Sequence, residues 1–302
     1  MSAPSVLGRD RLKKPSTDAP LVGIVREEGS NGDREMHAAM QAAGLRSADI
    51  RMADIVDGRI ELKHMNALAF VGGFSFGDVL GSATGWAASA LHNKRASEQL
   101  HEFLLGRNDT LSLGVCNGCQ LLSLLGTVPQ LGGSALGEQV TFGRNDSARF
   151  ESRLATLQVH ESAESVTPWL AGMSGLSFGM WCAHGEGKVR SERMSEVLEQ
   201  QLAPLRYAHP QIQQPTEVYP FNPNGSESGV AGVCSSDGRH LAMMPHPERS
   251  YQLRQIPHLP QGYHEALQSD CNEPGIDGVG IPELSPWMRL FDNVYNWLVH
   301  SG

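Results

Sequence analysis

Short, largely apolar runs alternate with helical patterns along the first half of the chain. The runs at 21–25, 67–71 and 110–115 are typical of buried parallel strands. Between them, apolar residues recur with a helical period over 36–43, and a second helical stretch covers about 86–105. Strands that alternate with helices through short connections predict an α/β fold, with a mostly parallel open sheet and helices on both faces.

The second half of the chain carries a hairpin signal and a final helix. Residues 229–234 and 240–244 flank Asp237-Gly238, a turn sequence that predicts a β-hairpin. Ser285-Pro286 then opens a helix with one apolar face, formed by Trp287, Leu290, Phe291, Val294 and Leu298.

Three segments lack either pattern. Residues 1–20 contain three prolines and no apolar period, so we expect a flexible arm or linker ahead of one folded domain over 21–302. Residues 127–150 are rich in Gly, Ser and Asn and predict a loop. Residues 250–284, interrupted by Pro and Gly, predict a second loop, of a length that is often functional.

Composition narrows the choice of partners and of cellular setting. The chain has 302 residues, 40% hydrophobic and 19% charged, which is ordinary for a globular protein. A formal net charge of -9 argues against nucleic acid or an anionic membrane as a partner. We find no apolar run long enough to span a bilayer and no signal-peptide pattern. Five cysteines, an odd number, do not indicate a disulfide framework, so we expect a reduced, cytoplasmic setting.

The sequence Gly114-Val115-Cys116-Asn117-Gly118 predicts a nucleophile elbow between the third strand and a helix. Such a turn needs glycine on both sides of the nucleophile, because a Cβ there would crowd the neighbouring backbone. The start of the helix points its free N–H groups at the sulfur and favours the thiolate. We therefore expect Cys116 to attack an electrophilic carbon.

His246 is the best candidate for the base that such a cysteine requires. It follows a predicted strand and stands between two prolines, with Glu248 two residues further on. In an extended segment these two side chains point the same way, so the carboxylate can orient the imidazole ring. The alternative is a rigid Pro-His-Pro loop whose histidine only caps a backbone group, and the cysteine elbow argues against it.

Cys116 and Cys119 also form a C-x-x-C pair, which would suit a redox site or half of a zinc site. No second pair of ligands with zinc-like spacing follows, so we expect no metal. We predict instead that Cys119 is a small apolar residue of the first helical turn. The same holds for Cys182 and Cys234 in their strands, and Cys271 falls in a loop without a signal.

An oxyanion hole completes the predicted site. Attack on a carbonyl creates a negative oxygen that needs preorganised N–H donors. One donor would be the backbone of Asn117, directly after the nucleophile. The other would be Gly73, in the Gly72-Gly73-Phe74 loop at the end of the neighbouring strand, although a plain strand-to-helix turn is the alternative reading of that loop.

Together these features resemble the triad-type (class I) glutamine amidotransferases. The shared features are the Gly-Gly loop, the elbow with Gln120 four residues after the cysteine, and the late His-x-Glu in the order Cys, His, Glu. Longer strings are similar to the glutaminase domain of single-chain synthetases that make formylglycinamidine ribonucleotide. These strings lie at 26–36, 71–82, 113–120, 183–187, 219–226 and 244–249.

The resemblance implies a flavodoxin-like sheet and a reaction. L-Glutamine would be hydrolysed to glutamate through a thioester on Cys116, and the ammonia would pass to an ATP-dependent synthetase of purine biosynthesis. The resemblance also implies that Gln120 and the Gly72–Phe74 loop hold glutamine. His184 and Glu186, in a predicted loop between glycines, would lie near the glutamine or the ammonia exit, unless that loop is only a surface turn.

The chain departs from such synthetases in one respect, since it has no phosphate-binding glycine loop joined to a lysine. We therefore expect no cofactor here, with ATP and magnesium only in the synthetase portion. The chain would be a glutaminase domain of the large form or a separate subunit, and we favour the domain. Three other classes remain open: a cysteine hydrolase or peptidase of related fold, a C-x-x-C redox protein, and a non-catalytic scaffold.

Overall fold

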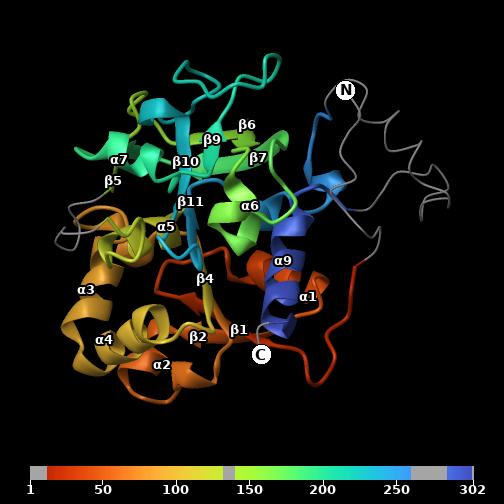
Figure 1. The fold of residues 1–302 in the computed structure, drawn as a ribbon. Coiled ribbons are helices and arrows are strands. Elements are labelled where there is room, and N and C mark those ends of the chain that lie inside the picture. Colours follow the sequence, from red (N-terminus) through yellow and green to blue (C-terminus); the bar gives the residue numbers. More distant parts are fainter. Residues whose placement is uncertain (1–11, 132–139, 260–283, 301–302) are drawn as a thin grey trace.

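A nine-stranded sheet in the order β2-β1-β3-β4-β11-β10-β9-β6-β7 forms the centre of the fold (Figure 1). The computed structural model describes residues 12–131, 140–259 and 284–300. The strands of the sheet are β1 Leu21–Arg26, β2 Arg46–Arg51, β3 Ala67–Phe70, β4 Leu111–Val115, β6 Glu151–Val159, β7 Ser177–His184, β9 Leu205–Tyr207, β10 Val230–Cys234 and β11 His240–Met243. A separate antiparallel pair joins β5 Thr141–Gly143 to β8 Lys188–Arg190.

One half of the sheet is parallel and has the predicted α/β arrangement. Strands β2, β1, β3, β4 and β11 are parallel to one another. The order β2-β1-β3-β4 is that of flavodoxin-like sheets, in which sites form beyond the carboxyl ends of the strands. The predicted fold class is confirmed, although β2, which has one buried residue, Ile50, was not predicted.

The other half of the sheet is antiparallel. The predicted hairpin is confirmed as β10 and β11, in which Gly232 pairs with Met243. Beyond it, β9, β6 and β7 continue the sheet with antiparallel pairing. Strand β11 therefore joins the two halves, parallel to β4 on one side and antiparallel to β10 on the other.

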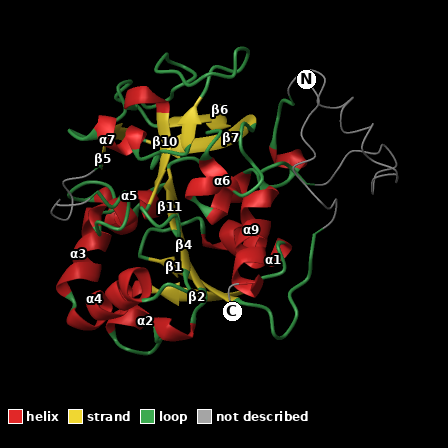
Figure 2. Ribbon diagram, in the orientation of Figure 1, coloured by secondary structure: helices red, strands yellow, loops and turns green. Residues whose placement is uncertain are grey.

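Helices cover both faces of the parallel half (Figure 2). Helix α1 (Asp33–Ala42) packs on β1 and β2 and touches α9 (Met288–His300), the predicted final helix. On the opposite face, α5 (Asn117–Leu124) packs on β3, β4 and β11. The other α-helices among the described residues are α2 Met52–Val56, α3 Thr84–His92, α4 Lys94–His101, α6 Ala163–Val166 and α7 Met194–Glu199. Of these, α2, α3 and α4 pack on the α5 side.

The single helical stretch predicted over 86–105 is divided into two helices. Asn93 has extended backbone angles between α3 and α4, and its side-chain oxygen accepts a hydrogen bond from the Ala96 N–H at 2.9 Å. This is an N-cap, which competes with continuation of the preceding helix. A π-helical turn over Glu102–Gly106 then leads toward β4.

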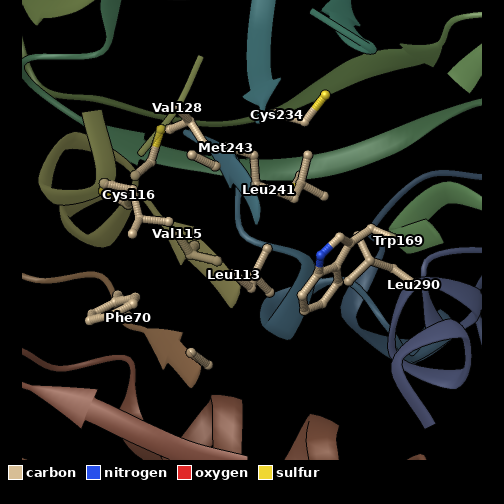
Figure 3. Packing of buried hydrophobic residues seen from close by; sticks show 14 of the residues in the cluster. Phe70, Leu113, Val115, Cys116, Val128, Trp169, Cys234, Leu241, Met243 and Leu290 are labelled. Atoms are coloured by element: carbon tan, nitrogen blue, oxygen red, sulfur yellow. The ribbon is translucent and has the colours of Figure 1, made fainter. Parts of the chain in front are cut away.

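The core lies between the sheet and these helices. Leu113 of β4 is paired with Leu241 of β11, and Figure 3 shows Trp169 and Leu290 beside them. All four side chains are buried, and burial of an aliphatic side chain of this size contributes about 1.5–3 kcal/mol. The Trp169 indole N–H donates to the Arg239 carbonyl at 2.9 Å, so the ring is buried without losing its hydrogen bond.

The described part of the predicted arm is packed against the domain. The Lys13 N–H donates to the Ala42 carbonyl at 2.9 Å. Its ammonium lies 3.6 Å from Asp292 Oδ1 and 4.5 Å from the centre of the Tyr295 ring. Residues 1–11 lie outside the described residues, as do 132–139 and 260–283, which belong to the two predicted loops.

Candidate active site

Cys116 stands at the sharp turn between β4 and α5 that its flanking glycines predict. Its backbone angles, φ 53° and ψ -107°, are strained for a residue with a side chain, as is usual for a nucleophile elbow. A Cβ on Gly114 would lie 2.5 Å from the Gly118 carbonyl oxygen, and one on Gly118 would lie 2.0 Å from the Phe70 carbonyl oxygen. Both glycines are therefore required for this turn.

The turn brings the sulfur to the start of α5 and close to β7. The Cys116 N–H donates to the Met243 carbonyl at 2.9 Å, which ties the elbow to the end of β11. The thiol lies 3.6 Å from the Ala183 carbonyl oxygen. The side chain is buried, with 7% of its surface exposed, so a reagent must enter the site to reach the sulfur.

His246 and Glu248 form a buried pair. The distance from His246 Nδ1 to Glu248 Oε1 is 2.6 Å, and each residue is 1% exposed. The two side chains meet across a 3₁₀ turn, Pro247–Arg249, rather than along the extended segment that the sequence predicted. The His246 N–H donates to the Trp181 carbonyl at 2.7 Å, which fixes the histidine backbone against β7.

The second nitrogen of His246 faces the elbow. Nε2 is buried and has no hydrogen-bond partner among the described residues. A Cβ on Gly72 would lie 2.9 Å from His246 Cε1 and 3.3 Å from Cys116 Cβ, so this glycine stands beside both groups. Burial lowers the pKa of His246, but the charge of Glu248, its hydrogen bond to Nδ1 and the nearby Cys116 together raise it to about 9. The imidazolium is thus favoured next to the sulfur.

The Gly72-Gly73 loop lies beside the elbow, held by the turn that follows β1. The Gly72 carbonyl accepts hydrogen bonds from the N–H groups of Asn31 and Gly32 at 3.1 and 3.2 Å. Gly73 has φ +146°, and a Cβ there would lie 2.5 Å from the Ser30 Cα. The conformation of this loop therefore depends on glycine at position 73 and on the hydrogen bonds from Asn31 and Gly32.

Asn117 and Gln120 occupy the first turn of α5. Asn117 is buried directly after the nucleophile, and its amide donates to Gln120 Oε1 at 3.2 Å. Gln120 in turn donates from Nε2 to the Glu186 carbonyl at 2.6 Å. Phe74 is 43% exposed at the mouth of the site, with its ring 5.9 Å from that of Phe150.

His184 lies elsewhere than the sequence predicted. It is the last residue of β7 rather than part of a loop, and it is buried. Burial lowers its pKa to about 3, and the nearby His246 lowers it as well, so the ring is neutral. Its Nε2 lies 3.4 Å from the hydroxyl of Tyr207, which also accepts a hydrogen bond from Asn224 at 3.2 Å. Tyr207 was missed by the sequence reasoning.

Cys119 is an apolar residue of α5, as predicted. It is fully buried, and burial raises the pKa of its thiol well above the ordinary value, as does the nearby Cys116. A neutral, buried thiol is a poor redox partner. Burial likewise raises the pKa of Cys182 and of Cys234 to about 12, and both lie in strands as predicted. Cys271 falls outside the described residues.

In the described ranges no group of three or more His, Cys, Asp or Glu side chains could hold a metal ion. Within the same ranges no helix has the length and hydropathy needed to cross a bilayer.

The site consists of a strained cysteine at a helix start and a buried His–Glu pair at the carboxyl ends of β4 and β11.

This fold and site define an α/β protein with a cysteine at a sharp strand-to-helix turn beside a buried His–Glu pair. The chain belongs to the CobB/CobQ-like glutamine amidotransferase domain family, whose model matches residues 19–298. It is 46% identical over 279 residues to a phosphoribosylformylglycinamidine synthase of Dictyostelium discoideum, covering 91% of this chain and 19% of that protein. The Homo sapiens phosphoribosylformylglycinamidine synthase is 44% identical over 303 residues, covering 96% and 21%.

The chain thus spans about a fifth of the length of these curated relatives. Among solved structures, PurLQS from Thermotoga maritima has a TM-score of 0.63 at 22% identity, covering 93% of this chain and 99% of that one. The similarity in structure agrees with the predicted fold, and the family match confirms the resemblance on which the predicted reaction rests.

Proposed function

We propose that this chain hydrolyses L-glutamine to glutamate and ammonia, with Cys116, His246 and Glu248 as its catalytic residues. The proposal rests on one observation: the strained Cys116 lies beside His246, and Nδ1 of that histidine lies 2.6 Å from Oε1 of the buried Glu248. Acyl transfer by a cysteine requires a nucleophile, a base and a group that orients the base, and this arrangement supports that chemistry.

The reaction begins with attack of the Cys116 thiolate on the side-chain amide carbon of glutamine. The N–H groups of Asn117 and Gly73 stabilise the negative oxygen of the tetrahedral intermediate, and one such donor typically contributes about 10²–10³-fold in rate. His246 gives a proton to the leaving nitrogen, so that ammonia departs and a glutamyl thioester remains. Water activated by His246 then releases glutamate and restores the thiolate.

Glu248 and the residues around the elbow prepare this sequence. Glu248 accepts the Nδ1–H hydrogen bond and holds Nε2 toward the sulfur. Gly72, Phe74, Gln120 and His184 border the space in which glutamine would bind. We expect Gln120 to shape this space through its hydrogen bond to the Glu186 carbonyl.

The ammonia would serve an ATP-dependent synthetase that converts formylglycinamide ribonucleotide to formylglycinamidine ribonucleotide in purine biosynthesis. The support is the identity of 44–46% to phosphoribosylformylglycinamidine synthases. Since the chain matches only 19–21% of their length, sites for ATP, magnesium and the ribonucleotide would lie in the remaining synthetase portion. We place the reaction in the cytoplasm, and the partner is that synthetase, as a domain or a subunit.

Release of glutamate tests the proposal. Glutamate release by the wild type and by Cys116→Ala is measured with glutamine alone and again after the synthetase portion is added. Turnover that disappears in the variant supports the reaction and its nucleophile together. If neither condition gives turnover and no glutamyl thioester can be trapped on Cys116, the glutaminase assignment is wrong. Loss of turnover on replacement of Cys119 instead would favour redox chemistry.

A further inference from the structure

The segment 219–226, one of the strings that carry the resemblance, has no role in the steps above. Three of its polar side chains, Asn222, Asn224 and Ser226, are each at most 1% exposed. Loops usually present such groups to water, and a buried amide or hydroxyl needs hydrogen-bond partners inside the protein. The partners of these side chains therefore show what the segment holds in place.

One partner is the turn between β7 and β8. The sheet holds β7 as far as His184, which pairs with Glu151, and β8 begins at Lys188, which pairs with Gly143. Residues 185–187 lie outside both strands. Their buried backbone groups must therefore find partners other than a neighbouring strand.

Two buried asparagines supply those partners. Asn145 donates from Nδ2 to the His184 carbonyl at 2.8 Å, and its Oδ1 accepts from the Gly187 N–H at 3.0 Å. Asn224 donates from Nδ2 to the Gly187 carbonyl at 2.8 Å. A Cβ on Gly187 would lie 2.9 Å from Asn224 Nδ2, so glycine is required for this close approach. The two amides thus hold the turn at both of its ends.

Asn224 is itself fixed within its own segment. Its Oδ1 accepts from the N–H and the hydroxyl of Ser226, at 3.0 and 2.7 Å. The carbonyl of Asn224 accepts from the Asp146 N–H at 3.2 Å, which ties the segment to the loop that carries Asn145. These bonds leave only the NH₂ group of Asn224 to face the turn. An aspartate at this position would place one buried acceptor against another.

The turn in question carries a contact that the proposed reaction uses. Glu186 stands in the middle of it, and its carbonyl accepts from Gln120 Nε2 at 2.6 Å. We propose that Asn224 is a positioning residue, which holds the 185–187 turn so that the Glu186 carbonyl fixes the side chain of Gln120. The inference rests on the proposed function. It gives the 219–226 segment a role that acts through the turn and not on the substrate.

A matched pair of variants separates positioning from support of the fold. Asn224→Asp removes the donors that face the turn. Asn222→Asp is the control, because Asn222 is a buried amide of the same segment whose Nδ2 donates to the carbonyls of Thr216 and Ser226, at 3.2 and 2.9 Å. Each substitution removes two buried hydrogen bonds, so urea unfolding is expected to show similar losses of stability.

Steady-state glutamate release is then measured with the synthetase portion added. Asn224→Asp is expected to raise KM for glutamine by about 10- to 100-fold with kcat within about threefold, whereas Asn222→Asp keeps both within about twofold. Alkylation of Cys116 by iodoacetamide should proceed at the wild-type rate in both, because the His246–Glu248 pair does not depend on the segment. An equal rise in KM for the two variants, or a rise in neither, would overturn the assignment and leave the glutaminase proposal standing.

A double-mutant cycle tests the route of the effect. Gln120→Ala removes the side chain that the turn is proposed to fix, so Asn224→Asp should change KM by less than about twofold in that background. If the two effects on KM multiply instead, Asn224 acts by another route and the inference is wrong.

Ser226→Ala provides a milder variant in case Asn224→Asp does not fold. It removes one hydrogen bond to Asn224 Oδ1 and is expected to raise KM by about 3- to 10-fold. An unchanged KM in this variant also counts against the inference. If the wild type releases no glutamate, the proposed function fails, and the positioning role of Asn224 fails with it.

Discussion

The carbonyl oxygen of Phe70 occupies the position that a side chain on Gly118 would need. A Cβ at Gly118 would lie 2.0 Å from that oxygen, which belongs to the end of β3. This close approach of helix α5 to the neighbouring strand lets the elbow turn sharply beneath Cys116. The position of Cys116 therefore depends on a contact made by Phe70, which has no part in the proposed chemistry.

Gly118→Ala is accordingly expected to lower the free energy of unfolding by about 1–3 kcal/mol, because backbone must move to admit the methyl group. Glutamate release should fall with it, since the elbow shifts. Gly143→Ala is the matched control, because its nearest neighbour is the Arg190 side chain at 4.0 Å. Chemical denaturation of both variants measures the effect, and equal stability for the two would show that the approach to Phe70 is unimportant.

Glu248→Gln should leave the fold in place and remove most of the activity. The amide can still meet His246 Nδ1, but it carries no charge and can hold the ring in the wrong tautomer. We expect kcat for glutamate release to fall by about 10²–10⁴-fold. Glu199→Gln, on the exposed end of α7, is the control. Activity within twofold of wild type for Glu248→Gln would exclude an orienting role for this carboxylate.

The pair of His246 and Glu248 should also make the free energy of unfolding depend on pH in a defined direction. His246 has a pKa of about 9 in the folded chain against an ordinary value of 6.5, so folding favours its protonated form. Its contribution is complete below about pH 6.5 and is lost as the pH rises through 9. The difference in unfolding free energy between wild type and His246→Gln should therefore shrink between these limits in urea titrations. A difference that stays constant or grows over this range would contradict the pKa shift.

Cys119→Ala is expected to keep glutaminase activity within a few fold of wild type. Its thiol is fully buried, and burial keeps it protonated, so it cannot exchange with Cys116 as a redox partner would. The small cavity created should cost about 1 kcal/mol of stability. Initial rates and thermal unfolding measure the two effects separately, and inactivation equal to that of Cys116→Ala would revive the C-x-x-C interpretation.

Much of the parallel half could be predicted because its strands are buried on both faces. The β1, β3 and β4 segments read as short apolar runs between helical patterns. The edge strand β2 could not be found this way, since Arg46–Arg51 has charged residues at both ends and only Ile50 is buried. Polar edge strands resemble loops in sequence.

The antiparallel half was harder to predict for a related reason. Buried and partly exposed positions alternate along β7, so this strand lacks a continuous apolar run. His184 was consequently placed in a loop, although it closes β7. The cysteine and histidine of the site could be predicted from the sequence, because glycine and proline mark the turns in which they lie. The contact of Gln120 with the Glu186 carbonyl could not be predicted, because these two residues meet only after the sheet has formed.

The place of β11 between β4 and β10 has a consequence for synthesis of the protein. Because the chain is synthesised from its amino terminus, Cys116 is made long before residues 240–246. A nascent chain that ends before His240 has neither the strand that receives the elbow's N–H nor the histidine that would activate the sulfur. The proposed active site is therefore complete only after β11 has joined the sheet.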